Sequence, residues 1–170
     1  MARKAVFIIA QKDFRDEELL EPKKVLEGRG IEVKIASQTK EKAIGKLGTE
    51  IKPDLAIAEI DPKDFNALVF IGGPGSQIYF NDPKAFRLIE GFKAAGKILG
   101  AICIAPSILA NAGALISKTV TSFPSEEENL KDKGAEYTGM QVEVDGKIVT
   151  AKDPTAAKEF GDKLAFVIED

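Results

Sequence analysis

The sequence predicts an α/β fold in which a mostly parallel β-sheet is covered by helices on both faces. Continuous apolar runs, such as Ala67–Ile71 and Ile98–Ile102, are typical of central strands that are buried on both sides. Amphipathic helical segments alternate with these runs along the chain. The chain has 170 residues, of which 44% are hydrophobic and 30% charged, so we expect one domain with a sizeable core over residues 1–170.

The first elements are expected to be two strands joined by a helix. Residues 4–10 and 31–36 have the apolar pattern of strands, and residues 17–27 have that of a helix. Asp13 or Asp16 is placed to cap this helix. Its apolar face is expected to contain four side chains, namely Leu19, Leu20, Val25 and Leu26.

The middle of the chain is expected to hold the centre of the sheet. Residues 44–60 contain glycine and proline and predict short, irregular strands. The buried strand at residues 67–71 leads directly into the glycine-rich segment Gly72–Ser76. The pair Asp82-Pro83 predicts the start of a helix to about Ala95, because Asp is favoured as N-cap and Pro at the first helical position.

The last third predicts two further helices and a hairpin. Ser125–Glu128 has the spacing of a capping box and predicts a short helix. Val142–Thr150 alternates in polarity around an Asp-Gly pair, which is a hairpin signal. Asp153-Pro154 is expected to cap a final amphipathic helix that runs to about Ile168.

The only cysteine, Cys103, follows an apolar strand and precedes a short helical pattern that Gly113 closes. A nucleophile on such a sharp strand-to-helix turn needs small neighbours, and Ala101 and Ala105 provide them. The first N–H groups and the positive end of the helix are expected to lower the pKa of the thiol. The alternative is a buried structural cysteine without chemistry.

The chain contains no histidine, which excludes a Ser-His-Asp triad or a Cys-His pair within one chain, and any zinc site built on histidine. We expect no metal and no cofactor. An acid–base partner for Cys103 must be a carboxylate, lysine, tyrosine or solvent. Three carboxylates at the start of the first helix are candidates, and spacing does not choose among them: Glu17, Glu18 and Glu21.

A thiol that attacks a carbonyl also needs donors for the resulting oxyanion. The backbone N–H of Ile104 follows the nucleophile directly, and Gly73 is a candidate second donor, because a missing side chain allows close approach. The alternative for the glycine segment is a plain turn after a strand.

Charge and hydropathy restrict the partners. The formal net charge is −3 and the lysines are scattered, which argues against nucleic-acid binding. No apolar segment approaches the roughly 18 residues that span a membrane. The N-terminal segment lacks the features of a signal peptide, so we expect a cytoplasmic protein without a membrane partner.

Several segments resemble the ThiJ/PfpI family, which includes intracellular protease-like proteins and the Parkinsonism-associated stress protein. The matching segments occur in the family's order, namely residues 14–22, 35–37, 69–75, 101–106, 121–124 and 144–146. The resemblance implies a flavodoxin-like three-layer sandwich with a mostly parallel central sheet, related to class I glutamine amidotransferases. It also implies a homo-oligomer, a dimer or larger.

Carried over by position, the resemblance implies that Cys103 is the family's elbow cysteine and Glu18 its acidic partner. It implies that the backbone of Gly73 and Ile104 forms the oxyanion hole. Ile104 stands where protease-like members have histidine, Gln77 where they have an acidic residue, and Phe123 near the position of a histidine in the stress-protein branch. A Cys-His-Glu protease triad is therefore absent.

The resemblance implies the activity of a glyoxalase or deglycase that acts on methylglyoxal-like dicarbonyls. Cys103 would add to an aldehyde as a hemithioacetal, and Glu18 would transfer the proton. One alternative is a redox-responsive stress protein in which Cys103 is oxidised to a sulfinic acid without turnover. Another is a scaffold with an inert cysteine, in which buried Ile104 and Phe123 make the pocket apolar.

Overall fold

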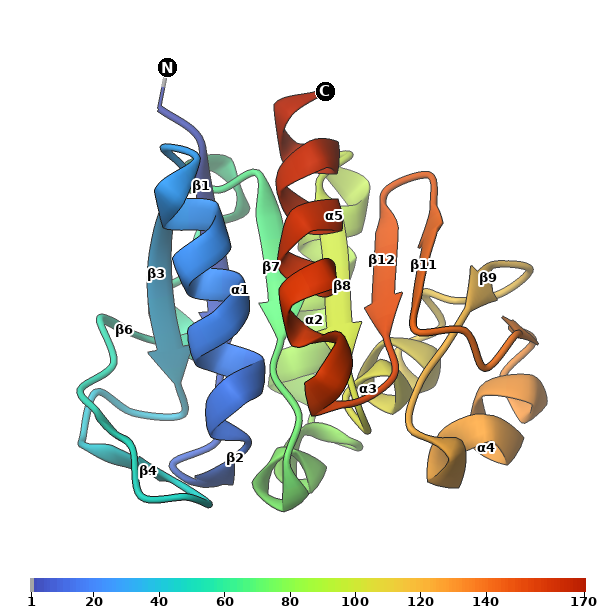
Figure 1. The fold of residues 1–170 in the computed structure, drawn as a ribbon, viewed down its shortest axis with the longest axis horizontal. Coiled ribbons are helices and arrows are strands. Elements are labelled where there is room, and N and C mark those ends of the chain that lie inside the picture. The colour runs from blue at the N-terminus through green and yellow to red at the C-terminus, as the bar shows by residue number, and fades with distance from the viewer. Residues whose placement is uncertain (1) are drawn as a thin grey trace.

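A seven-stranded sheet forms the centre of the computed structural model, which describes residues 2–170 (Figure 1). The strand order is β11-β12-β8-β7-β1-β3-β6. Neighbouring strands are parallel except for β11 and β12, which form the predicted hairpin. The strands are β1 (Lys4–Ile8), β3 (Glu32–Ser37), β6 (Leu55–Ala56), β7 (Ala67–Phe70), β8 (Ile98–Ile102), β11 (Val142–Asp145) and β12 (Ile148–Ala151). The predicted α/β fold with a mostly parallel sheet is confirmed.

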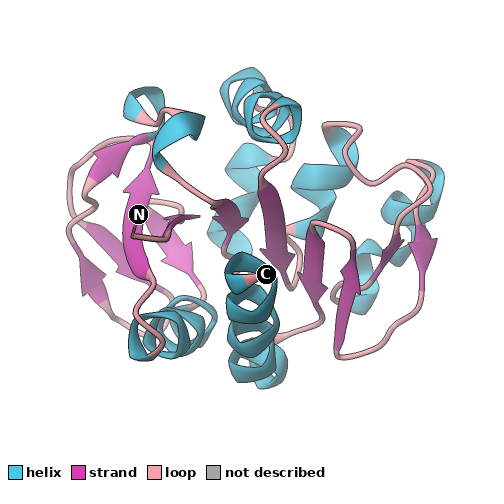
Figure 2. Cartoon of the chain, turned by 90° about the horizontal axis from the view of Figure 1, so that it is seen from above, coloured by secondary structure: helices cyan, strands magenta, loops and turns pink. Residues whose placement is uncertain are grey.

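Helices cover both faces of this sheet (Figures 1 and 2). α1 (Asp16–Gly28) and α5 (Ala157–Glu169) lie on one face, and α2 (Pro83–Ala94) and α3 (Pro106–Asn111) on the other. Strand β1 supplies both cores, because successive side chains of a strand point to opposite faces. Phe7 joins the cluster under α1 and α5, whereas Val6 and Ile8 join the cluster under α2.

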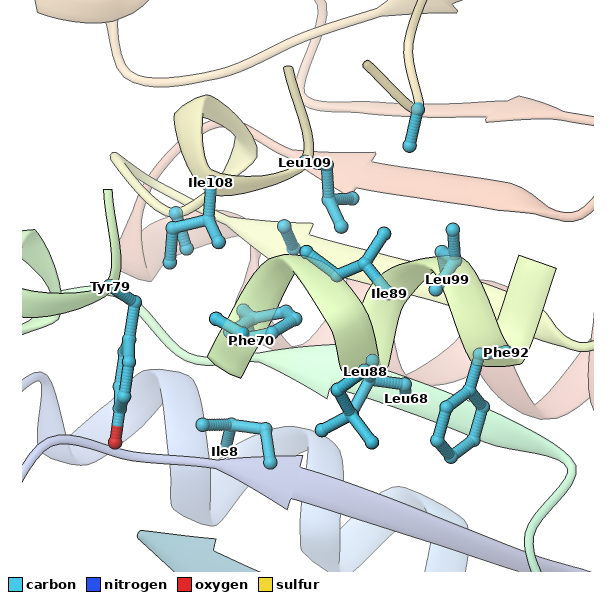
Figure 3. Packing of buried hydrophobic residues seen from close by; sticks show 14 of the residues in the cluster. Ile8, Leu68, Phe70, Tyr79, Leu88, Ile89, Phe92, Leu99, Ile108 and Leu109 are labelled. Atoms are coloured by element: carbon cyan, nitrogen blue, oxygen red, sulfur yellow. The ribbon is translucent and has the colours of Figure 1, made fainter. Parts of the chain in front are cut away.

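The core under α2 consists of aromatic and branched side chains from helix and sheet (Figure 3). Phe92 of α2 and Leu68 and Phe70 of β7 are fully buried there. Tyr79 is also buried, and its hydroxyl donates to the carbonyl oxygen of Ile9 at 2.8 Å. Burying the phenol therefore leaves no unpaired hydroxyl, which would cost about 1–3 kcal/mol.

Two small sheets and short helical turns lie around this framework. β2 (Lys12–Phe14), β4 (Ala43–Gly45) and β5 (Glu50–Ile51) form one sheet, and β9 (Thr119–Val120) and β10 (Glu136–Tyr137) form the other. α4 (Glu127–Asp132) lies beside the second one. The 3₁₀ turns are Ile57–Glu59, Pro62–Asp64, Pro74–Tyr79, Pro124–Glu126 and Pro154–Ala156. The irregular strands predicted within residues 44–60 are confirmed.

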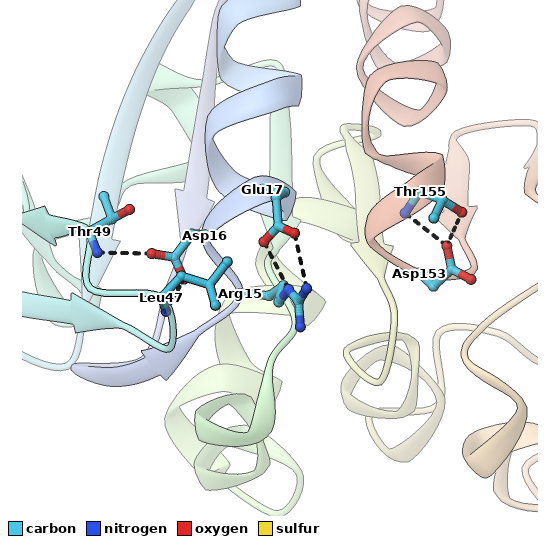
Figure 4. Close-up of polar contacts among 7 residues, drawn as sticks. All are labelled: Arg15, Asp16, Glu17, Leu47, Thr49, Asp153 and Thr155. Atoms are coloured by element: carbon cyan, nitrogen blue, oxygen red, sulfur yellow. Dashed lines mark hydrogen bonds and ion pairs between the residues drawn. The ribbon is translucent and has the colours of Figure 1, made fainter.

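The two expected Asp-Pro caps are present. The carboxylate of Asp82 accepts from the N–H of Lys84 at 3.1 Å, and that of Asp153 accepts from the N–H of Thr155 at 2.9 Å (Figure 4). After Asp153 the chain first makes a 3₁₀ turn and then continues as α5. The predicted capping box at Ser125 is wrong, because its hydroxyl donates to Glu126 and α4 begins without a side-chain cap.

The expected cap of α1 is also wrong. Arg15 occupies the N-cap position without a side-chain hydrogen bond, and Asp16 is the first helical residue. The apolar face is narrower than predicted, since Leu20 is 42% exposed. The Asp16 carboxylate instead accepts from the N–H groups of Leu47 at 2.8 Å and Thr49 at 2.9 Å (Figure 4). Asp16 thus fixes the turn between β4 and β5 rather than the end of its own helix.

Asp16→Asn is expected to destabilise the protein by about 2 kcal/mol at pH 7, because one of the two N–H groups loses a charged acceptor. Burial raises the pKa of the Asp16 carboxyl, but hydrogen bonds from Thr49 and Leu47 outweigh it, so the pKa lies below its usual value. This stabilisation exists above the unfolded pKa and is lost as pH falls through the folded one. In urea titrations the difference from wild type should shrink as the pH falls from 7 to 3. Asp162→Asn, at an exposed position on α5, is the control. An equal difference at both pH values would contradict the prediction.

Helices α1 and α5 approach each other closely at a glycine. A Cβ atom on Gly161 of α5 would lie 2.8 Å from the Cα of Pro22 and 3.0 Å from the Cβ of Val25, both on α1. Such distances are shorter than van der Waals contact, so only glycine allows this approach. The two helices therefore lie side by side over the sheet, as Figures 1 and 2 both show.

Candidate active site

The carboxyl ends of three neighbouring parallel strands converge on one cavity. Cys103 follows β8, Gly73 follows β7, and Glu18 lies in α1, which follows β1 and β2. Sites form at this edge of a parallel sheet because the connections after the strands meet there. The cavity has a volume of about 320 Å³, and its wall contains all four predicted site residues, Glu18, Gly73, Cys103 and Ile104. A larger hollow of about 860 Å³ lies between residues 40–42 and 50–54, without a nucleophile.

Cys103 occupies the turn between strand and helix in a strained backbone conformation. Its φ is 66°, a backbone angle that residues other than glycine, Asn and Asp rarely adopt. The N–H of Cys103 donates to the carbonyl oxygen of Ala151 at 2.9 Å, and its carbonyl oxygen accepts from the N–H of Phe123 at 2.8 Å. These bonds to two other segments hold the turn in place, and the half-buried thiol lines the cavity.

Glu18 is completely buried next to this cysteine. Neither carboxyl oxygen has a hydrogen-bond partner that meets normal geometry among residues 2–170. A Cβ atom on Gly72 would lie 2.5 Å from Oε1 of Glu18 and 2.9 Å from the Cβ of Cys103. Gly72 therefore provides the space in which the carboxyl and the cysteine approach each other.

Glu17 and Glu21, the other two candidate carboxylates at the start of α1, have different surroundings from Glu18. Glu17 accepts from Nε of Arg15 at 2.8 Å and from Nη2 at 3.0 Å, in a two-pronged ion pair (Figure 4). Glu21 is exposed on the outer side of α1. Of the three carboxylates that spacing could not separate, only Glu18 lines the cavity.

The pKa shift of Cys103 differs from the one that the sequence predicts, and that of Glu18 explains part of the difference. Burial raises the pKa of Glu18 to about 8, against smaller lowering effects of the Cys103 thiol and the Gly72 N–H. Burial also raises the pKa of the Cys103 thiol, the Glu18 carboxylate raises it further, and the Ile104 N–H lowers it. The predicted lowering of the thiol pKa is therefore wrong in direction, because α3 is a six-residue helix whose N–H groups do not offset burial.

The titrations of Glu18 and Cys103 are linked, because the thiol lowers the pKa of the carboxyl as a hydrogen-bond donor, whereas the carboxylate raises the pKa of the thiol. At pH 7 Glu18 is mainly neutral, and a neutral carboxyl can donate a hydrogen bond to a sulfur anion instead of repelling it. The cavity therefore accommodates one negative charge at a time, on either the carboxyl or the sulfur. That arrangement suits proton transfer within the pair.

Gly73 and Ile104, the two predicted backbone donors, both line the cavity that contains the thiol. Gly73 has a φ of 99°, and a Cβ atom there would lie 2.4 Å from the N of Arg15. The N–H groups of Gly73 and Ile104 donate to no carbonyl or carboxylate oxygen of residues 2–170. The Ile104 N–H acts on the Cys103 sulfur, so both N–H groups are candidates to donate to an oxyanion that develops beside it.

The remaining wall residues include three departures from the family pattern and two that the sequence did not single out. Ile104 is half-buried and Phe123 is 41% exposed, so the expectation that both are buried is wrong. Gln77 is exposed at the rim. Arg15 and Lys46 also line the cavity. Nothing in the sequence marks Lys46, because it lies 28 positions after Glu18 in an irregular segment.

Neither a metal-binding cluster nor a membrane-spanning helix occurs among residues 2–170. No group of three or more His, Cys, Asp or Glu side chains in this range could hold a metal ion. None of the helices in this range has the length and apolar character needed to cross a membrane.

Comparison with known proteins points to one family. The model of the DJ-1/PfpI family matches residues 3–166. An uncharacterized protein of Methanocaldococcus jannaschii is 42% identical over 98% of this chain and 82% of its own length. A protein of Thermococcus kodakarensis named a deglycase is 36% identical over 88% of this chain and 90% of its own. A glutathione-independent glyoxalase of Caenorhabditis elegans is 26% identical over 98% of this chain and 89% of its own.

A solved structure has nearly the same fold. The ThiJ/PfpI domain protein of Brachyspira murdochii superimposes with a TM-score of 0.96 at 32% sequence identity, over 99% of this chain and 97% of that one. The flavodoxin-like sandwich that the resemblance implied is therefore confirmed.

Proposed function

Because the chain belongs to the DJ-1/PfpI family, we propose that it is an enzyme of the glyoxalase or deglycase type that acts on small α-oxoaldehydes. Cys103 is the nucleophile and Glu18 the proton-transfer group. The observation that carries the proposal is the half-buried thiol beside a completely buried carboxyl, neither of whose oxygens has a hydrogen bond of normal geometry among residues 2–170. The deglycase and glyoxalase names of two relatives support it.

The first step is addition of the thiol to the aldehyde carbon of the substrate. A C–S bond forms, and the carbonyl oxygen receives the thiol proton, which gives a hemithioacetal. The N–H groups of Gly73 and Ile104 stabilise the negative charge that develops on this oxygen. No imidazole is needed, which fits a chain without histidine.

Glu18 then moves one proton between two carbons. Its ionised form takes the proton from the former aldehyde carbon, and the resulting acid returns a proton to the neighbouring carbonyl carbon. The first carbon is oxidised to a thioester and the second is reduced to an alcohol, so no external oxidant is required. Water then hydrolyses the thioester, releasing a 2-hydroxy acid and the free thiol. With a pKa of about 8, Glu18 is close to the value at which a general base is most effective near neutral pH.

Methylglyoxal is expected to yield lactate in the presence of the wild-type protein. Cys103→Ala should lower the rate to the uncatalysed background, and Glu18→Gln should lower it by about 10²-fold or more. The wild-type rate should rise with pH through about 8, as the basic form of Glu18 accumulates. The measurement is enzymatic detection of lactate over time.

Glu21→Gln is the matched control, because Glu21 lies three positions further along α1 and is exposed. It should retain the wild-type rate. The proposal is contradicted if lactate forms at the same rate with wild type and Cys103→Ala.

A second candidate function is reversible or terminal oxidation of Cys103 by peroxide. It is favoured by the same neutral carboxyl, which can donate a hydrogen bond to a sulfinate oxygen. Mild hydrogen peroxide should then add two oxygen atoms to the intact mass of wild type but none to that of Cys103→Ala. An unchanged wild-type mass would exclude this candidate.

The homo-oligomer implied by the resemblance stays a prediction. Sedimentation of the purified protein would test it directly.

A further inference from the structure

Two cationic side chains line the cavity beside Cys103, and the proposed reaction uses neither of them. Arg15 is the residue directly before α1, and Lys46 lies in the turn between β4 and β5. A neutral dicarbonyl offers nothing to a guanidinium or an ammonium group beyond weak hydrogen bonds. Arg15 and Lys46 therefore give information about the charge of the substrate that Cys103 and Glu18 do not give.

Arg15 is oriented by an ion pair outside the cavity wall. Its Nε and one Nη2 hydrogen are directed at Glu17, which is not a wall residue. A guanidinium has five N–H donors, so further donors remain for a ligand. Its charge lies close enough to Glu18 to lower the pKa of that carboxyl.

Lys46 is held at the cavity by its backbone. Its N–H donates to the carbonyl oxygen of Phe14 at 2.9 Å, and the next residues of the turn are bound by the Asp16 carboxylate. A Cβ atom on Gly45 would lie 2.5 Å from Oδ2 of Asp16, so the turn is packed directly on that carboxylate. Among residues 2–170 the Lys46 ammonium forms neither an ion pair nor a hydrogen bond. The backbone of Lys46 is thus held at the cavity, while its side chain is exposed and its charge is unpaired among residues 2–170.

The cavity wall contains two cationic residues, Arg15 and Lys46, and one carboxyl, Glu18, which is mainly neutral at pH 7. Glu17 offsets the charge of Arg15, and Lys46 has no counterion. The carboxylate of Asp153 acts on Cys103 from outside the wall and accepts from both the N–H and the hydroxyl of Thr155. Among residues 2–170, Lys46 is the wall cation without an ion pair, and a ligand with one negative charge would supply its partner.

We propose that the substrate is a small α-oxoaldehyde that carries a carboxylate, which binds between Arg15 and Lys46 while its aldehyde reaches Cys103. This inference rests on the proposed function for the aldehyde, but not for the carboxylate. Recognition of the anion is a property of the empty cavity and can be measured without turnover.

The test compares two alkylating reagents of nearly equal size, iodoacetate and iodoacetamide, which differ in charge. Both form a C–S bond with Cys103 and release iodide, so the ratio of their rates cancels the fraction of ionised thiol. For wild type the iodoacetate-to-iodoacetamide ratio should exceed that of free glutathione. Lys46→Gln and Arg15→Gln should each lower this ratio by about threefold, the effect of one partly exposed charge pair.

Lys24→Gln is the matched control, since Lys24 is exposed on α1 outside the cavity. It should leave the ratio unchanged. A wild-type ratio equal to that of glutathione, or a ratio unaffected by both cavity variants, overturns the inference.

A turnover arm separates this inference from the proposed function. Methylglyoxal is compared with 4,5-dioxopentanoate, an α-oxoaldehyde with a carboxylate, whose product would be 2-hydroxyglutarate. Higher kcat/KM for the carboxylated substrate, lost in Lys46→Gln, supports both. A raised alkylation ratio without turnover of either compound supports anion binding and overturns the proposed function. Equal kcat/KM for the two substrates overturns the inference and leaves the glyoxalase proposal intact.

Discussion

Glu18→Gln is expected to make the protein more stable at pH 8 than wild type, although it removes the proposed proton-transfer group. Burial raises the pKa of Glu18 from 4.5 to about 8 in the folded state. Between these values the folded protein holds a proton that the unfolded chain has released, so the free energy of unfolding falls as pH rises. At about 1.36 kcal/mol per pKa unit, the loss approaches about 5 kcal/mol by pH 8. Glutamine cannot ionise and should show no such slope.

The measurement is urea-induced unfolding of wild type and Glu18→Gln at half-unit intervals from pH 5 to 8. The two curves of stability against pH should diverge steadily, with the variant on the upper side at pH 8. Glu21→Gln should follow the wild-type slope, because that carboxylate is exposed. Parallel curves for wild type and Glu18→Gln would mean that the folded carboxyl ionises normally, and the proposed sharing of one charge with Cys103 would fail.

Gly72→Ala is expected to damage both the fold and the site. The added Cβ would lie 2.5 Å from Oε1 of Glu18 and 2.7 Å from the carbonyl oxygen of Ile102. The carbonyl belongs to β8 and cannot move without breaking the sheet, so the contact costs about 3 kcal/mol. The carboxyl must also move away from the cysteine, which should lower the rate of lactate formation at least as much as Glu18→Gln does.

Gly28→Ala is the matched control for Gly72→Ala, at a position away from the site. It lies at the end of α1, and a Cβ atom there would meet nothing within 4 Å. Thermal unfolding and lactate formation should both stay close to wild type. If Gly72→Ala were as stable and active as Gly28→Ala, the packing of Glu18 against Gly72 would not be needed for the site.

The sheet was predictable because its strands are unambiguous in sequence. The runs Ala67–Phe70 and Ile98–Ile102 are apolar throughout, as strands buried on both faces require. The caps at Asp82 and Asp153 were predictable because an Asp-Pro pair acts on the next residues of the chain. Local signals therefore gave the framework, and with it the edge where the site forms.

Features that depend on distant partners were not predictable in this way. Asp16 has the sequence context of a cap, yet its partners are the N–H groups of Leu47 and Thr49, more than 30 positions away. Spacing could not distinguish Glu18 from Glu17, because the difference is made by Gly72 from another strand end. Only the family resemblance identified it. The predicted direction of the Cys103 pKa shift was wrong for the same reason, since burial is a property of the assembled core.

The close approach of α5 to α1 at Gly161 has a consequence for the order of folding. Glu18 is held by α1, which lies against the sheet beside α5. Pro154, just before α5, forms part of the cavity wall around Cys103. The cavity around the cysteine and its carboxyl is therefore complete only when the segment of Pro154 and α5 has docked on the sheet. Before this docking, the thiol lacks part of the wall that encloses it.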